Sequence, residues 1–331
     1  MHTPYIGIHY PEEFGGQGLG LFESLLVSEA FCRVDSGIGS AISFSDLGSE
    51  IILKFGIQEQ KERFLIPLVR GEKRLSVAFG ESEDRKNCSS ILSTAEKKEK
   101  GYLIVGEKRF VPNISLADAF MMLCKEPKEG LVILIVERDR VGMEIHPIDQ
   151  MGLRMIPFGH LRVKEVWVPH SNQVGTWENT IHQFDYFNQV MGLKGLAQAL
   201  GTIEGAFDRA LKYANQREQF SRRLSQFQVI RHKLADMAVG MEVARCLTYK
   251  SVVEFDRKEM DQGFLSLAQL EVGRRLVWGV NEALQIFGGY GYIAEQDIEH
   301  FYRDAWALLV ELGTEEELKD IFTEGILGKH S

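Results

Sequence analysis

The stretch ALKYANQREQFSRRLSQFQVIRHKLADMA, residues 210–238, decides how the second half of the chain folds. Apolar residues recur at helical spacing on both sides of its charged centre, and Leu234, Met237 and Met241 fall on one helix face. Residues 185–216 alone can form a helix roughly 45 Å long, at about 1.5 Å per residue. The pattern therefore predicts two long helices joined by a basic turn.

The spacing of apolar residues divides the chain into three regions. Residues 75–175 contain short apolar runs such as GLVILIVER between glycine or charged turns, which is typical of strands in a small sandwich or barrel. Residues 1–74 and 176–331 carry helical periodicity. We therefore predict a multidomain α+β protein with an N-terminal helical domain (1–74), a middle antiparallel β domain (75–175) and a C-terminal helical bundle (176–331).

Composition excludes several functional classes. The chain has 331 residues, which exceeds the size that one hydrophobic core usually supports. Its formal net charge of −9 argues against a nucleic-acid or anionic membrane surface. The longest apolar run, residues 131–136, is too short to span a bilayer, and the first residues lack the pattern of a secretory signal. Four scattered cysteines predict reduced thiols in a cytoplasmic protein: Cys32, Cys88, Cys124 and Cys246.

Two motifs each allow a structural and a functional interpretation. FGGYGY (287–292) can end a helix, because glycine adopts left-handed backbone angles, or it can let a ligand approach the backbone closely. NQREQFSRRL (215–224) gathers three arginines around Phe220, either as a solvated basic turn or as a site for phosphate oxygens. No metal site is predicted, because four histidines lack partners at ligand spacing: His160, His170, His182 and His232.

The segment LVELGTEEE (309–317) places four carboxylates around a Gly-Thr pair, so it can carry a catalytic base or begin a helix. Thr314 and Glu317 have the spacing of a capping box, in which each side chain satisfies a backbone N–H of the other residue. Acidic residues in a first helical turn also suit the helix dipole. We therefore predict a structural role for Glu315, Glu316 and Glu317.

Four stretches together resemble the acyl-CoA dehydrogenase family, and the resemblance runs nearly end to end. They are PEEFGGQGLG (11–20), IDQMGLRMIPFGHLRVKEVWVP (148–169), residues 210–238 quoted above, and ALQIFGGYGYIAEQDIEHFYRDA (283–305). The resemblance implies a helical domain, a β domain and a C-terminal four-helix bundle, assembled as dimers or tetramers. It also implies FAD as the cofactor and oxidation of the α–β bond of an acyl-CoA thioester. Relative to the family pattern, the chain begins inside the first helical domain.

The catalytic base of the family has no counterpart at its usual position. That base stands immediately before a Gly-Thr pair, where this chain has Leu312. Glu311 is one residue away and should point elsewhere, because one helical residue turns by about 100°, so it is a weak candidate. Glu81 and Asp84 are further candidates for a relocated base. The segment 187–195, where some family members carry the base, has no carboxylate.

The face that meets the flavin in this family is degenerate here. The two hydroxyl donors of the family's T-E-P-x-x-G-S-D loop correspond to Gly80 and Lys86. The aromatic shelf is reduced to Phe110, and the hydroxyl that meets the flavin is replaced by Pro112, which has neither a side-chain donor nor a backbone N–H.

The residues that hold the ADP end of a neighbouring subunit's FAD in this family are retained, although Ser221 replaces a glycine. They are Arg217, Phe220, Gln228, Gln285, Gly288 and Gly289. The resemblance therefore implies an intact ADP half-site beside a poor flavin half-site.

We interpret the chain as one subunit of a heteromeric acyl-CoA dehydrogenase. A related partner subunit would supply the base, the flavin-facing loop and the acyl pocket, so that FAD is shared with that partner. Acyl-CoA is the expected substrate of the complex, an electron-transfer flavoprotein is a candidate acceptor, and neither nucleic acid nor a membrane span is expected. Two alternatives remain: a complete but divergent dehydrogenase that uses Glu311, and a non-redox protein that binds CoA or a nucleotide on the same fold.

Overall fold

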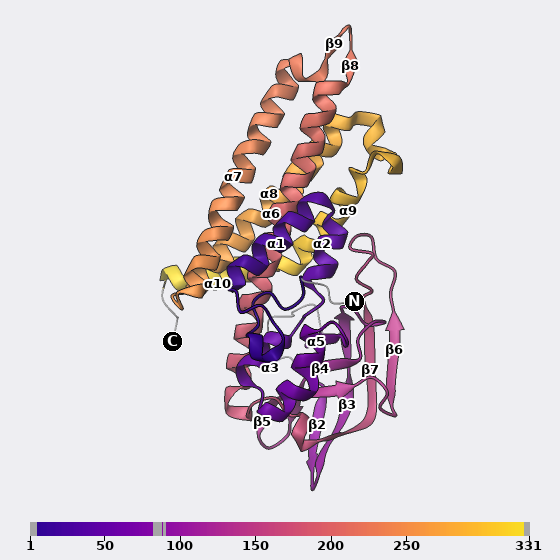
Figure 1. Ribbon diagram of the computed structural model, residues 1–331, viewed down its shortest axis with the longest axis vertical. Coiled ribbons are helices and arrows are strands. Elements are labelled where there is room, and N and C mark those ends of the chain that lie inside the picture. Colours follow the sequence, from indigo (N-terminus) through magenta and orange to yellow (C-terminus); the bar gives the residue numbers. More distant parts are fainter. Residues whose placement is uncertain (1–4, 82–87, 89–90, 328–331) are drawn as a thin grey trace. The chain divides into compact units, whose positions relative to one another are not determined.

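The computed structural model describes residues 5–81, 88 and 91–327, and the chain divides into two compact units (Figure 1). The first, the sheet unit, comprises Met1–Leu19, Ser43–Gln150 and Ile156–Val190. The second, the helical unit, comprises Gly20–Ile42, Met151–Met155 and Met191–Ser331. Each unit is therefore assembled from segments that are distant in the sequence.

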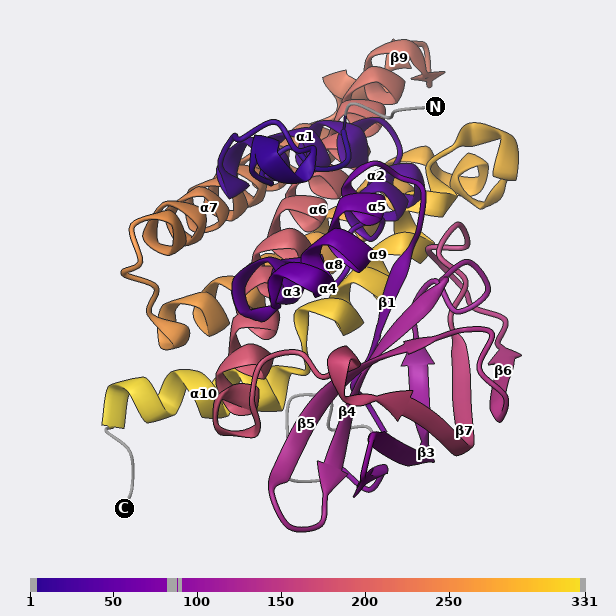
Figure 2. The same ribbon diagram turned by 60° about the horizontal axis from the view of Figure 1, so that its bottom comes forward.

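A seven-stranded sheet forms the centre of the sheet unit, in the order β1-β4-β2-β3-β7-β6 with β5 paired to β4. Figure 2 shows β3, β7 and β6 next to one another. The strands are β1 (Leu75–Ala78), β2 (Thr94–Lys98), β3 (Gly101–Val111), β4 (Ala119–Glu126), β5 (Gly130–Glu137), β6 (Met143–Pro147) and β7 (Gly159–Pro169). Inward-facing residues of β3, β4, β5 and β7 form one apolar core, because side chains alternate between the two faces of a strand.

The predicted β domain is confirmed, but its sheet is mixed rather than antiparallel throughout. Strand β4 runs parallel to β1, with Leu75 opposite Ala119, and it also meets β2 in parallel. Strand β1 precedes the β2–β3 hairpin, and a strand that returns after such a crossover runs parallel to its neighbour. The sequence does not reveal β2, because only Ala95 among its five residues is buried.

Short helices complete the sheet unit: a 3-10 turn (Glu12–Phe14), α3 (Ser49–Phe55), α4 (Gln58–Gln60), a π-helical turn (Lys61–Leu65), α5 (Ile66–Val69) and two 3-10 turns (His170–Asn172, Trp177–Asn179). Pro67 lies in the first turn of α5, directly after the π-helical turn. Proline is tolerated in a first helical turn because its missing N–H has no helical partner to lose.

Long helices make up most of the helical unit. They are α1 (Leu21–Val34), α2 (Ser36–Ser43), α6 (Thr180–Gln216, which starts in the sheet unit), α7 (Gln228–Asp256), α8 (Gln262–Phe287), α9 (Glu299–Leu312) and α10 (Glu315–Leu327). A hairpin of β8 (Glu218–Gln219) and β9 (Arg222–Arg223) joins α6 to α7, as Figure 1 shows at its upper end. The predicted pair of long helices with a basic turn is confirmed. Within the described ranges, no helix is long and apolar enough to cross a bilayer.

Candidate functional site

A cavity of about 520 Å³ opens beside the C-terminal end of α8. Arg217, Gly288, Gly289 and Tyr290 are among the residues that line it. Gly288 ends α8 with a φ of +59°, and a Cβ placed on Gly288 or Gly289 would meet no atom within 4 Å. The glycines therefore end the helix, and they also leave open space in front of the backbone.

Arg217 follows directly after α6 and projects its guanidinium to 5.1 Å from the ring centre of Tyr290. Its backbone is fixed at both sides, because its N–H donates to Tyr213 O (2.8 Å) and its carbonyl accepts from Leu224 N–H (2.9 Å). Among the residues that the structure describes, no carboxylate forms an ion pair with Arg217. Its fork of N–H donors can therefore serve an external anion.

The β8–β9 hairpin presents an aromatic side chain to solvent. Phe220 is 88% exposed. Phe220 and Ser221 have φ angles of +52° and +61°, the left-handed conformation that a two-residue hairpin turn of type I′ requires. Side chains with a Cβ are strained in this region, so the serine at position 221 is less favourable than a glycine.

Gln285 lines a second cavity of about 540 Å³, together with Gly288 and Arg154. Phe220 and Gln228 are not among the lining residues of these two cavities, and Gln228 is the exposed first residue of α7. Four of the six residues expected to hold an ADP group thus gather around the end of α8: Arg217, Gln285, Gly288 and Gly289.

Leu312 is fully buried at the end of α9. A Cβ on Gly195 of α6 would lie 3.1 Å from its Cδ2, and a Cβ on Gly273 of α8 would lie 3.4 Å from its Cδ1. The Gln269 amide donates to the Leu312 carbonyl (2.8 Å), which fixes the end of α9. Leu312 therefore fills the space that two glycines leave between helices. Its neighbour Glu311 is half-buried.

The capping box at the start of α10 is confirmed. Thr314 N–H donates to Glu317 Oε2 (3.1 Å), and Glu317 N–H donates to Thr314 Oγ1 (3.2 Å). Hydrogen bonds from Lys319 and Arg274 lower the pKa of Glu315. The acidic segment after Gly313 thus begins a helix.

Glu81 is held in a buried ion pair, which makes it a poor catalytic base. Its Oε1 lies 2.5 Å from Lys108 Nζ, and Lys108 is fully buried. Its carboxylate also accepts backbone N–H groups of Leu92 (2.5 Å) and Ser93 (3.0 Å). Burial raises the pKa of Glu81, but the Lys108 charge and these hydrogen bonds outweigh burial and lower it. The carboxylate is therefore committed to binding donors within the sheet unit.

The described residues of the predicted flavin face lie in the sheet unit. Phe110 is 41% exposed and meets the His160 ring edge-on, with 5.6 Å between the ring centres. Its φ of +52° belongs to an irregular stretch of β3, where the register against β7 shifts between Lys108 and Val111.

Two other members of this face use their backbone carbonyls for hydrogen bonds within the sheet unit. Pro112 O accepts the Ser76 hydroxyl, and Gly80 O accepts Arg109 N–H (2.9 Å). The predicted residues Lys86 and Asp84 lie outside the described ranges.

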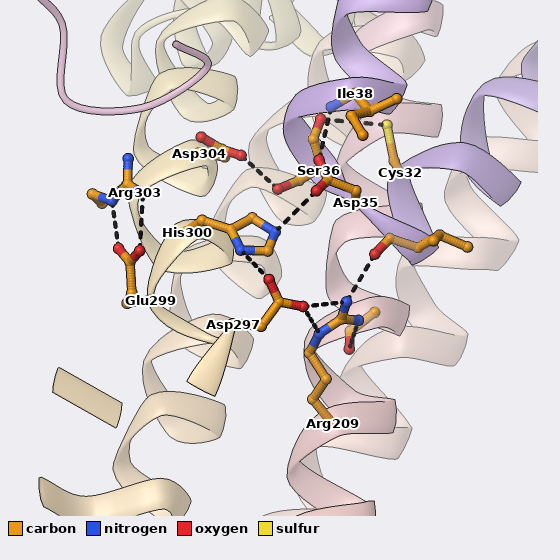
Figure 3. A network of polar contacts seen from close by, with 12 residues as sticks. Cys32, Asp35, Ser36, Ile38, Arg209, Asp297, Glu299, His300, Arg303 and Asp304 are labelled. Carbon is orange, nitrogen blue, oxygen red and sulfur yellow. Dashed lines mark hydrogen bonds and ion pairs between the residues drawn. The ribbon is translucent and has the colours of Figure 1, made fainter. Parts of the chain in front are cut away.

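A polar network around α9 escaped the sequence reasoning (Figure 3). Asp304 is only 4% exposed and accepts Ser36 Oγ–H and Leu153 N–H, both at 2.6 Å. Its neighbour Arg303 donates to Met151 O (2.9 Å). The Arg-Asp pair of HFYRDA therefore anchors α9 to α2 and to the segment 151–155. The only signal in the sequence is the adjacent Arg-Asp pair at the end of the segment 283–305.

The same network continues towards α1 through His300. Its Nδ1 lies 2.9 Å from Asp297 Oδ1, and its Nε2 lies 3.8 Å from Asp35 Oδ2 (Figure 3). Arg209 donates to Asp297 Oδ2 (2.8 Å) and to Val34 O (2.8 Å), so it caps the last turn of α1. These contacts hold the helix that carries Glu311 and Leu312 in a fixed position.

Comparison with known proteins identifies the class to which this fold and site belong. Residues 4–72, 76–166 and 193–327 match the N-terminal, middle and C-terminal domains of acyl-CoA dehydrogenase, respectively. The 3-(aryl)acrylate reductase of Clostridium sporogenes is 31% identical over 98% of this chain and 87% of that protein. The chain belongs to the acyl-CoA dehydrogenase family, whose members are FAD-dependent oxidoreductases.

Two further relatives bear on assembly and fold. The caffeyl-CoA reductase-Etf complex subunit CarC of Acetobacterium woodii is 30% identical over 98% of this chain and 87% of that protein. The structure of butyryl-CoA dehydrogenase from Megasphaera elsdenii superposes with a TM-score of 0.93 at 29% identity, covering 98% of this chain and 87% of that one. The predicted order of a helical, a β and a helical domain is therefore confirmed.

Proposed function

We propose that the chain is one subunit of a heteromeric acyl-CoA dehydrogenase, in which it gives the ADP half of an FAD site to a related partner subunit. The observation that carries the proposal is the contrast between Leu312 and Arg217. Leu312 stands at the position of the family base and is fully buried. Arg217 instead lines an open cavity with Gly288 and Gly289.

The residues around the end of α8 suit a diphosphate. Arginine binds phosphate oxygens through two parallel N–H groups, and Arg217 has no carboxylate competitor among the described residues. Open space in front of Gly288 and Gly289 lets an anion approach backbone N–H groups. FAD, when bound, would supply the hydride acceptor, and this chain would orient its ADP end.

This chain offers few groups that could bind the flavin end of FAD. Pro112 offers no donor, Gly80 has no side-chain hydroxyl, and the Gly80 carbonyl already accepts the Arg109 N–H. Glu81 is bound by Lys108, so it cannot readily accept a substrate proton. We therefore assign the base, the flavin-facing loop and the acyl pocket to the partner, with acyl-CoA as the substrate of the complex.

The name of the Acetobacterium woodii relative supports an assembled state, because that protein is a subunit of a complex with Etf. An electron-transfer flavoprotein is accordingly our candidate electron acceptor. We propose domain boundaries at 1–74, 75–175 and 176–331, which the three matched family regions support.

The decisive experiment is the flavin absorbance of the purified chain, alone and co-expressed with a related acyl-CoA dehydrogenase subunit. We expect little or no FAD on the chain alone and stoichiometric FAD in the complex. A homo-oligomer of this chain that retains stoichiometric, tightly bound FAD would overturn the heteromeric assignment and favour a complete, divergent enzyme.

The half-site is tested by Arg217→Ala in the complex. Loss of a charge-assisted hydrogen bond typically costs about 1.5–3 kcal/mol, which corresponds to roughly a ten- to hundredfold weaker FAD affinity. Arg223→Ala is the matched control, because it removes an exposed arginine of the same hairpin that does not line the cavity. If both variants bind FAD as tightly as the unmodified complex, Arg217 does not contribute to FAD binding.

A further inference from the structure

Three side chains that can bind a metal converge within the sheet unit. His9, Asp46 and Glu50 each offer one ligand atom, and these atoms all lie within 4.8 Å of one another. His9 Nε2 is 3.9 Å from Glu50 Oε1, and the two side chains are only 8% and 7% exposed. Asp46 is 8% exposed. The donors are thus one imidazole nitrogen and two carboxylates in a nearly dry environment.

Neighbouring groups hold this cluster in place. The fully buried Tyr10 donates its hydroxyl to Asp46 Oδ2 (3.2 Å) and lies 2.5 Å from Ser49 Oγ. The Ser49 hydroxyl in turn donates to the Asp46 carbonyl. The rings of His9 and Tyr10 are 4.2 Å apart. Hydrogen bonds from outside groups orient metal-binding carboxylates in the same way in known sites.

The charge of the cluster favours a divalent cation. When ionised, Asp46 and Glu50 carry two adjacent negative charges, and these attract a divalent cation. One divalent ion would balance both carboxylates.

The donor set also restricts the choice of ion. One nitrogen and two oxygen donors suit Zn²⁺ or a similar first-row ion better than Mg²⁺ or Ca²⁺, which prefer oxygen donors alone. Ligand atoms around a tetrahedral Zn²⁺ lie roughly 3.4 Å apart, given bonds of about 2.1 Å. The ligand atoms, now within 4.8 Å of one another, would therefore move closer by up to about 1.4 Å on binding.

We propose that His9, Asp46 and Glu50 form a binding site for one Zn²⁺-like ion, which ties the N-terminal segment 5–19 to the start of α3. The three ligands come from positions 9, 46 and 50, so no local motif in the sequence predicts the site. The role is structural, because the ion would join two segments of the sheet unit. The site is independent of the FAD proposal.

The test is metal binding by the full chain after treatment with EDTA and dialysis. When Zn²⁺ is added back and the excess is removed, we expect one bound equivalent by elemental analysis. Zn²⁺ should raise the melting temperature, and EDTA should reverse this rise. Co²⁺ in place of Zn²⁺ should give visible d–d absorption. His9→Ala and the nearly isosteric Glu50→Gln should each weaken Zn²⁺ binding at least about tenfold, and Tyr10→Phe should weaken it by up to about tenfold.

His146 and Glu144 provide a matched control, because their Nε2 and Oε2 atoms are also 3.9 Å apart but the side chains are 57% and 38% exposed. His146→Gln should leave Zn²⁺ binding and the thermal shift unchanged. If the unmodified chain binds no Zn²⁺ after EDTA treatment, or if Glu50→Gln binds it as tightly, the site is refuted. The first of these results needs no variant, so misfolding of His9→Ala would not leave the question open.

Discussion

The hydroxyl of Tyr249 on α7 lies 3.0 Å from both carboxylate oxygens of Glu29 on α1, across 220 sequence positions. Glu29 is only 8% exposed, and Glu204 on α6 adds a second buried carboxylate nearby. Arg245 balances part of this charge through Glu204, with 2.5 Å between the paired atoms. The helical unit thus contains a buried acidic contact that can respond to pH.

Burial raises the pKa of Glu29 from 4.5 to about 6, although the Tyr249 hydrogen bond opposes the shift. Because the folded pKa exceeds the unfolded one, this group adds stability at low pH and loses that contribution as the pH rises through about 6. We expect Glu29→Gln to remove about 2 kcal/mol of pH dependence between roughly pH 4.5 and 7, at about 1.36 kcal/mol per pKa unit. Urea unfolding across this range measures the effect, and identical pH profiles for both proteins would contradict it.

Thr314→Ala removes the hydroxyl that accepts Glu317 N–H at the start of α10. We expect a loss of about 1 kcal/mol in the free energy of unfolding, the typical cost of an N-cap residue. Glu316→Gln is the control, because Glu316 is exposed in the same turn and takes no part in the capping box. Equal stability of all three proteins in chemical denaturation would show that the capping box contributes nothing.

Ser221→Gly should stabilise the β8–β9 hairpin, because Ser221 has a φ of +61°. A left-handed residue with a Cβ costs about 1–2 kcal/mol, so we expect a gain of up to about 1 kcal/mol after the extra flexibility of glycine is counted. Ser225→Gly, in the 3-10 turn Leu224–Gln226, should bring no such gain. Hydrogen exchange of the hairpin amides reports the change, and faster exchange in Ser221→Gly would argue against strain at this turn.

Lys108→Met should destabilise the sheet unit strongly, because it leaves the Glu81 carboxylate without its buried partner. Breaking a buried ion pair costs about 3–5 kcal/mol. Lys97→Met is a matched control, since Lys97 Nζ also lies 2.5 Å from a carboxylate (Glu129) but the lysine side chain is 47% exposed. The control should cost much less stability, because an exposed ion pair contributes little. Similar losses in the free energy of unfolding for both variants would mean that the buried Lys108–Glu81 pair contributes no more stability than an exposed pair.

Leu312→Glu restores a carboxylate at the family position, yet we expect no dehydrogenase activity from this chain alone. The position is fully buried between α6 and α8, where the charged form of a carboxylate is disfavoured and its pKa is raised. Leu312→Met is the control, because it keeps the side-chain volume and should lower the free energy of unfolding by less than about 1.5 kcal/mol. The assay is anaerobic reduction of FAD by acyl-CoA thioesters. Bleaching of FAD by Leu312→Glu alone would refute the degenerate flavin face.

The sequence predicts those elements that depend only on residues close together in the chain. The spacing of Thr314 and Glu317 defines a capping box, and the period of Leu234 and Met237 defines α7, wherever the rest of the chain lies. The three domains followed from the family resemblance and from the change between helical and strand-like patterns. The parallel pairing of β1 with β4 did not follow, because it depends on a crossover rather than on either strand.

Long-range contacts account for the residues that the sequence did not reveal. Asp304 acquires its role from Ser36 and Leu153, which lie far away in the chain. His9 gains Asp46 and Glu50 as neighbours only after α3 packs beside the N-terminal segment. Glu81 is a candidate base from the sequence alone, but in the fold Lys108 of β3 forms an ion pair with it.

The division of the chain into interleaved segments has a consequence for its synthesis on the ribosome. Helix α1 belongs to the helical unit, yet Tyr249, its partner through Glu29, is translated 220 residues later. At about 5–20 residues per second, the apolar face of α1 waits roughly 10–45 s for α7 to emerge. Most of the sheet unit lies between α1 and α7 in the sequence, and this unit can form first. Nascent chains shorter than about 250 residues should therefore recruit chaperones through α1, and the signal should fade once α7 has left the exit tunnel.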